Sequence, residues 1–229
     1  MNAYLSVFKS DIKHIRRDPM LLMLFVVPFI ILIFIKYAVP YIASFIPELA
    51  NYYTLVLAFF SVMSANFPGF IVSFMLLDEK DLGLFPVIKV QPISLSGFLK
   101  VRIGFITVFG FVSSLLILLF NGIVEFTVIK SVVISILSAF TVPVLVLTIS
   151  FIAKNKVEGM TLLKVMNVTL LLPVAIFFIH SPTEYLLGVF PAFWVYKFIE
   201  FEDISYLIAF AGFIYLLCLN YFVYGKIVK

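Results

Sequence analysis

The sequence has little charge and almost no cysteine, and each shortage excludes a class of protein. Only 12% of the 229 residues are charged, whereas 64% are hydrophobic and the mean hydropathy is +1.21. Soluble domains carry about a quarter charged residues, so a water-soluble fold could not cover this much apolar surface. The single cysteine, Cys218, lies inside an apolar run without a partner in the chain, which excludes a disulfide framework.

The familiar motifs of catalytic sites are also missing. The chain has no Walker-type phosphate loop, no H-E-x-x-H or G-x-S-x-G sequence and no paired cysteines at metal-ligand spacing. Its two histidines stand apart, and we interpret both as interfacial: His14 in a basic N-terminal segment and His180 at the end of an apolar one. We therefore predict that the chain is not an enzyme and binds no metal and no cofactor.

Long apolar runs make up most of the chain. Runs of 17 residues or more predict helices that cross the bilayer, and the alternating segments of about ten residues that a barrel needs are absent. The fold class predicted is an all-α integral membrane protein with six transmembrane helices in one domain, residues 19–229. The predicted spans are residues 20–39, 52–77, 103–120, 128–153, 165–179 and 205–224.

Two further segments are predicted to lie at the membrane without crossing it. Residues 1–18 place Phe8 on an apolar face and Arg16 and Arg17 on a basic one, which is typical of an amphipathic interfacial helix, and Asp18 then caps the first span. Residues 180–204 are apolar but interrupted by prolines. Neither half could cross about 30 Å of hydrocarbon, so we predict extracellular re-entrant half-helices.

The distribution of Lys and Arg predicts the orientation, because cytoplasmic loops carry an excess of both. With six spans, thirteen of the sixteen fall on the side of the chain termini and three on the other. Both termini are therefore predicted to be cytoplasmic, and the net charge of +4 is a signal of topology, not of nucleic-acid binding. The three opposite residues are Lys36, Lys130 and Lys197.

The interior of the spans has almost no ionisable side chain. An ion-coupled transporter usually buries such groups near the midplane, so the energy for transport is expected to come from outside the bilayer. The second span does contain Ser64, Asn66 and Pro68. Two interpretations stay open for them: a polar pathway lining with a hinge at the proline, or interhelical hydrogen bonds beside a simple bend.

The densest run of charge lies between the second and third spans, in residues 78–102. Acidic residues begin it, and exposed apolar residues follow them, which favours a contact with a protein partner over a solvated loop. The order of several weak motifs resembles the permease subunits of type-2 ABC exporters. These motifs are Arg16 to Pro19 before a proline-containing span, Glu79 and Gly83 in an E-x-x-x-G sequence, and Gln91 to Ser94 where that family has a T-P-[LIV]-S turn, with Gln in place of Thr.

The resemblance implies a bacterial plasma-membrane exporter of a hydrophobic or amphipathic compound, such as a drug, a peptide or a lipid-like molecule. It implies a dimer with a second permease, identical or not, and two copies of a cytoplasmic ATPase that holds ATP and Mg²⁺. Residues 78–102 are then the coupling loop. The residues expected to contact the ATPase are Asp78, Glu79, Lys80, Asp81, Gly83, Leu84, Phe85 and Pro86, and those expected as lever or second contact are Pro92, Ser94, Lys156 and Glu158.

Two other functions stay open on the sequence. One is a channel or facilitator that works without ATP, and the other is a membrane subunit that binds a peptide and confers immunity without transporting it.

Overall fold

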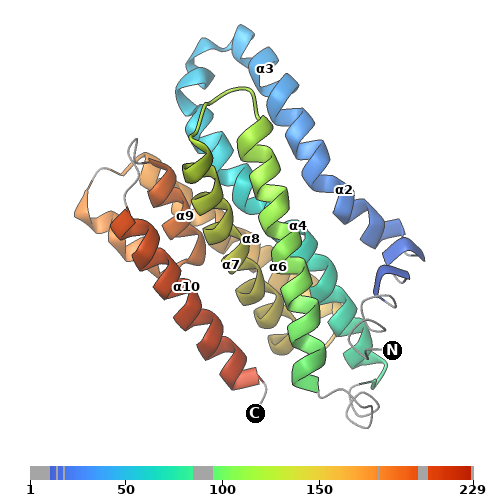
Figure 1. Cartoon of the computed structure of the whole chain (residues 1–229). Helices are drawn as coiled ribbons and strands as arrows, with labels where there is room; N and C mark the ends of the chain where they lie inside the picture. The colour runs from blue at the N-terminus through green and yellow to red at the C-terminus, as the bar shows by residue number, and fades with distance from the viewer. Residues whose placement is uncertain are drawn as a thin grey trace.

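The computed structural model is a bundle of helices that describes residues 11–13, 15–17, 19–84, 95–179, 181–200 and 206–227 (Figure 1). Residues 11–13 and 15–17 are helical and belong to the predicted interfacial helix. The other described elements are α2 (Pro19–Ile33), the π-helical segment η1 (Phe34–Ala38), α3 (Val39–Phe45), η2 (Pro47–Tyr52), α4 (Tyr53–Asp81), α6 (Leu95–Phe120), α7 (Val128–Ile152), α8 (Lys156–Leu171), η3 (Leu172–Phe177), η4 (Pro182–Val189), α9 (Pro191–Glu200) and α10 (Tyr206–Ile227).

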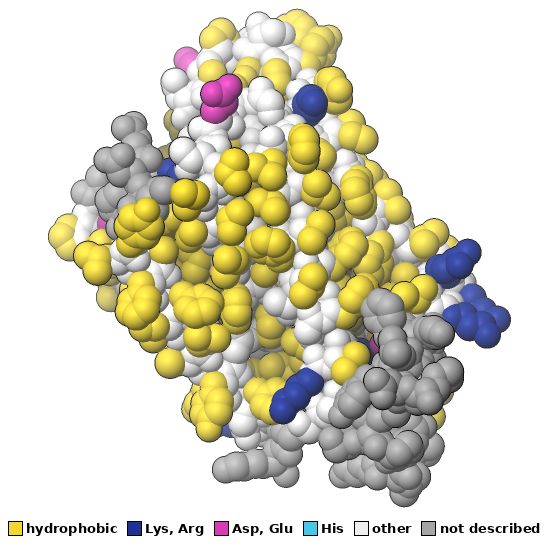
Figure 2. Space-filling view, viewed as in Figure 1, with side chains coloured by type: hydrophobic (Ala, Val, Ile, Leu, Met, Phe, Trp, Pro, Cys, Tyr) yellow, Lys and Arg dark blue, Asp and Glu magenta, His cyan; other side chains and the backbone are white. Residues whose placement is uncertain are grey.

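Six helical segments in the described part of the chain are long and apolar enough to cross a bilayer, which confirms the predicted fold class. Their ends define two ends of the bundle. At the lower end in Figure 1, α4 and α7 finish and α6 and α8 begin; α3, η2 and the link from α6 to α7 lie at the upper end. Figure 2 shows a broad apolar belt between these ends, as a bilayer requires.

Several helices extend further than the sequence predicts. The first span continues through η1 to the end of α3 at Phe45, and η2 follows after Ile46, so residues 40–51 between the first two predicted spans are helical except at Ile46. Helix α6 begins at Leu95 and α8 at Lys156, before the predicted 103 and 165. The reason is the same at both sites, since a helix keeps its backbone hydrogen bonds as it passes from hydrocarbon into the polar headgroup layer. The polar segment 78–102 therefore holds the last turn of α4 and the first two turns of α6.

Helix α4 lies at the centre and packs against α6 and α7, with α2, α8 and α9 around it. Small residues bring these helices close together. A Cβ at Gly110 of α6 would lie 2.8 Å from the carbonyl oxygen of Ala65, and one at Gly69 would lie 3.0 Å from a methyl group of Val142. Close backbone approach through small residues is the usual basis of helix packing in membranes.

The segment between the fifth and sixth spans folds as two short helices, η4 and α9. The ten-residue α9 is too short to cross the bilayer, yet seven of its ten residues are buried. Tyr196 Oη donates to the carbonyl oxygen of Leu170 at 2.8 Å, and Trp194 Nε1 donates to that of Gly188 at 3.1 Å. These bonds join α9 to the end of α8 and to η4.

Candidate functional site

At the lower end, α4 stops in a motif that requires glycine. The N–H of Leu84 donates to the carbonyl oxygen of Glu79 at 2.9 Å, and the N–H of Gly83 donates to that of Lys80 at 3.0 Å. Gly83 has φ of +66°. This is a Schellman cap, in which the residue after the helix adopts the left-handed conformation. The E-x-x-x-G sequence thus places Glu79 and Gly83 at the two ends of a single helix cap.

Arg102 of α6 joins the interfacial helix to the end of α4. Its Nε and Nη2 donate to the two carboxylate oxygens of Asp11 at 2.7 and 2.5 Å, and its Nη1 donates to Glu79 at 2.6 Å. The guanidinium also lies 4.2 Å from the centre of the Phe98 ring. Because the Arg102 side chain is only 5% exposed, these charge-assisted bonds are shielded from water and hold the three elements together.

The acidic end of α4 also binds the start of α8. Lys156 Nζ lies 2.9 Å from the Asp78 carboxylate, and the Lys156 N–H donates to Asp81 at 3.1 Å. In return, Lys80 Nζ donates to the carbonyl oxygen of Ala153, the residue that ends α7, at 2.6 Å. The end of α4 is therefore bonded to α6, α7 and α8 together.

Helix α8 begins with reciprocal capping bonds. Asn155 Oδ1 accepts from the N–H of Glu158 at 2.9 Å, and a Glu158 carboxylate oxygen accepts from the N–H of Lys154 at 2.8 Å. This resembles a capping box, which satisfies free donors at a helix start. The buried Gly159 then lets α8 approach α4, since a Cβ there would lie 2.3 Å from a methyl group of Leu77.

We call this set of bonded residues the lower-end cluster. It brings together residues that are far apart in the sequence, including five of those predicted as ATPase or lever contacts. Its members are Asp11, Asp78, Glu79, Lys80, Asp81, Arg102, Ala153 and Lys156.

The other residues predicted for the ATPase contact, the lever or the interfacial helix lie outside this cluster. Leu84 is 38% exposed beside Gly83, and Arg16 and Arg17 are exposed on the interfacial helix. Glu158 is used in capping α8. The remaining predicted residues, Phe8, Asp18, Phe85, Pro86, Pro92 and Ser94, lie outside the described residues.

The polar residues of the second span are enclosed within the protein. Asn66 Nδ2 donates to Thr141 Oγ1 of α7 at 2.8 Å and to the carbonyl oxygen of Val62 at 2.9 Å. Ser64 and Pro68 are buried on the same helix. The hydrogen bond from Asn66 to Thr141 joins α4 to α7, as in the interpretation of these residues as interhelical hydrogen-bonding groups. That the same residues line a transport pathway stays a prediction.

At the upper end, a second group of charges is buried around α9. Lys197 Nζ lies 2.7 Å from carboxylate oxygens of both Glu184 and Glu200. Burial by itself lowers the pKa of the Lys197 ammonium, but the bonds to the two carboxylates outweigh it and raise that pKa. The lysine therefore stays charged and joins η4 to α9.

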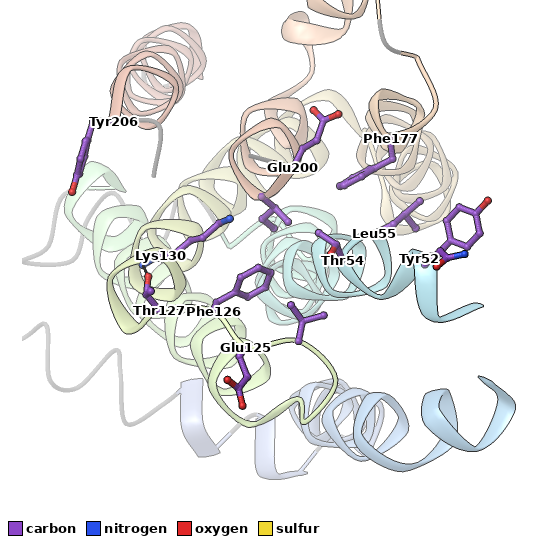
Figure 3. A pocket seen from close by; sticks show the side chains of 13 residues that line it. Tyr52, Thr54, Leu55, Glu125, Phe126, Thr127, Lys130, Phe177, Glu200 and Tyr206 are labelled. Carbon is purple, nitrogen blue, oxygen red and sulfur yellow. Dashed lines mark hydrogen bonds between the residues drawn. The ribbon is translucent and has the colours of Figure 1, made fainter. Parts of the chain in front are cut away.

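A pocket of about 850 Å³ opens beside this group. Figure 3 shows Phe126 and Lys130 pointing toward its middle, whereas Glu125 points away from it. Lys130 is 5% exposed, and its Nζ lies 5.1 Å from the centre of the Phe126 ring. The pocket is thus lined by aromatic and charged side chains together.

Comparison with known proteins agrees with this architecture. A family model described as "Fluoroquinolones export permease protein Rv2686c-like" matches residues 11–224. The chain belongs to this family of export permeases. Two relatives from Mycobacterium tuberculosis, named fluoroquinolones export permease protein MT2760 (strain CDC 1551) and Rv2686c (strain H37Rv), are each 27% identical over 197 residues, which cover 82% of this chain and 78% of the relative. No solved structure matches the chain.

Sequence reasoning missed several charged residues of this permease. Arg102 and Asp11 are 91 residues apart, and no local pattern connects them. Glu184 is likewise hidden in an apolar segment. Only the i,i+3 spacing of Lys197 and Glu200 could have indicated an ion pair, because residues three apart face each other on a helix.

Proposed function

We propose that this chain is the membrane subunit of an ATP-driven ABC exporter of the type-2 class, acting as a dimer with two copies of a cytoplasmic ATPase. The observation that carries the proposal is the lower-end cluster. It bonds the interfacial helix to the ends of four spanning helices, α4, α6, α7 and α8. A partner that moves the end of α4 would therefore move the spans with it.

The orientation predicted from charge supports an ATPase at this end. The predicted topology puts thirteen of the sixteen Lys and Arg residues on the side of the chain termini, and the positive side of a membrane protein is cytoplasmic. ATP is available there. The exposed apolar side chains of Leu82 and Leu84, which are 73% and 38% exposed beside the cluster, supply surface for a protein partner.

The distribution of carboxylates argues against ion coupling. Every Asp and Glu in the six spanning segments lies within the first or last two turns of its helix. Ion-driven transporters usually carry such groups near the midplane. We therefore assign the energy source to ATP hydrolysis on a separate subunit, which also holds the nucleotide and Mg²⁺.

The names of the relatives suggest the class of substrate. Fluoroquinolones are flat aromatic compounds with a carboxylate and an amine, and so are amphipathic. The pocket beside Lys130 has aromatic and charged walls that suit such a compound, and its position at the upper end suits release. We propose export of an amphipathic aromatic drug of this kind.

The test is uptake of norfloxacin, which is fluorescent, into inside-out membrane vesicles with and without this chain. We expect uptake that needs Mg-ATP, is insensitive to dissipation of the proton gradient, and is strongly reduced by Glu79→Gln but not by the control Lys226→Gln. Uptake that is unchanged by ATP would refute ATP-driven transport.

A second experiment tests the alternative of a facilitator that works without ATP. Purified chain alone, reconstituted into liposomes, is expected to move no norfloxacin. Flux down a gradient without ATP would establish a facilitator and overturn the proposal.

A further inference from the structure

Helix α10 stands partly away from the bundle. It packs on α7 and α9, where Asn220 Nδ2 donates to the carbonyl oxygen of Phe140 at 2.9 Å and the rings of Phe140 and Phe213 meet edge to face at 5.2 Å. Its link to α6 is at the lower end, where Tyr224 Oη and Ser96 Oγ are 2.5 Å apart. Above this link, a gap separates α10 from α6.

The gap is an open groove of about 480 Å³ between α6, α7 and α10. Its walls are mainly apolar, including Ile103, Pro143 and Leu217. Gly104 leaves the α6 wall bare, because a Cβ at this position would have nothing within 4 Å. The groove therefore has room for a flexible apolar chain that enters from the side.

The lower rim of the groove is positive and aromatic. Lys100 is exposed there, with Nζ 5.8 Å from the centre of the Tyr224 ring. Tyr221, which is 83% exposed, lies on the same rim. Tyrosines and lysines in this arrangement mark the headgroup level of a bilayer. None of the described residues that line the groove is acidic, so the rim suits an anion.

We infer that this groove binds an anionic phospholipid of the leaflet at the lower end, with its phosphate at Lys100 and an acyl chain along Gly104. The lining of α6 runs from Lys100 to Thr107, which is about 10 Å at 1.5 Å per residue, whereas half of the hydrocarbon layer is about 15 Å. The groove thus covers about two thirds of the depth of one leaflet. This site does not depend on the transported substrate or on the ATPase.

The experiment measures lipid binding by the purified full-length chain in detergent with native mass spectrometry. The probes are dioleoylphosphatidylglycerol, which is anionic, and dioleoylphosphatidylcholine, which has no net charge. Gly104→Leu adds an apolar side chain to the groove at a position where a Cβ has nothing within 4 Å, and Lys100→Gln removes the charge from an exposed position. Gly225→Leu is the control for Gly104→Leu, because a Cβ at Gly225 also has nothing within 4 Å. Lys226→Gln is the control for Lys100→Gln, because the ammonium of Lys226 also lies over an aromatic ring, that of Phe222.

We expect the wild type to prefer phosphatidylglycerol. Lys100→Gln should weaken that binding about fivefold, as for one lysine near a membrane surface, and should weaken phosphatidylcholine less, because its choline offsets the charge of its phosphate. Gly104→Leu should weaken both lipids at least tenfold, while both controls bind as the wild type does. The inference is overturned if the wild type binds both lipids equally, if Gly104→Leu binds like Gly225→Leu, or if Lys226→Gln loses as much as Lys100→Gln.

Discussion

Replacing Arg102 by Met tests whether the lower-end cluster holds the helices together. The substitution keeps a long apolar stem beside Phe98 but removes three hydrogen bonds to Asp11 and Glu79. Both carboxylates then remain, 15% and 18% exposed, without their cation. Breaking a buried ion pair in this way costs about 3–5 kcal/mol, because a charge is left in a poorly solvated place.

The assay is thermal unfolding of the purified permease in detergent. For a chain of this length, each kcal/mol lowers the midpoint by about 2–4 °C, so Arg102→Met should lower it by roughly 6–20 °C. Lys156→Met is the matched control. Its pair with Asp78 is about a third exposed on both sides, and such a pair contributes less than about 1 kcal/mol.

A rescue experiment separates charge from packing. Adding Asp11→Asn and Glu79→Gln to Arg102→Met removes the unpaired charges, and we expect most of the lost stability to return. The reasoning is refuted if Arg102→Met melts no lower than Lys156→Met, or if neutralising both carboxylates restores nothing.

Three further pairs of substitutions have outcomes that the backbone and the buried charges predict. Gly83→Ala should lower the free energy of unfolding by about 1–2 kcal/mol, because Gly83 has a left-handed φ. Gly83→Asn should lower it less, and thermal unfolding measures both. Gly110→Ala should destabilise the protein by about 1–3 kcal/mol, because the added methyl group meets the Ala65 carbonyl. Gly104→Ala in the same helix should stabilise the protein by about 0.5–1 kcal/mol. Equal unfolding midpoints for these two variants would contradict the packing of α6 on α4. Lys197→Met should lower the midpoint more than Lys197→Arg, since only Arg keeps a charge between two carboxylates, and proteolysis of the segment around α9 offers a local readout.

The number and order of the spans could be predicted because the bilayer acts on every residue of a span alike. A long apolar run needs no distant partner to be recognised. The positions where helices end could not be predicted equally well, since the polar residues before 165 are helical through a local cap. Asn155 is that cap, and its effect on Glu158 is visible only once the helix is in place.

Of the candidate site, only the part that is contiguous in the sequence could be predicted. The acidic residues and Gly83 lie together in the sequence, so a common role could be inferred, although the left-handed cap that explains the glycine could not. Arg102 is different, because its partners belong to two other elements, and one of them is 91 residues away. Only the tertiary packing of α6 against α4 shows which carboxylates it binds.

A single helix connects the two polar sites of this permease. Leu55 of α4 lines the upper pocket, and Glu79 of α4 binds Arg102 at the lower end. The 24 helical steps from Leu55 to Glu79 span about 36 Å of continuous helix at 1.5 Å per residue. Halfway along, Gly110 of α6 lies against the carbonyl oxygen of Ala65, and a methyl group of Val142 of α7 lies against Gly69. Because Gly110 brings α6 against the backbone of α4 with no side chain of its own in between, we expect a displacement of the lower end of α4 to be passed on to α6.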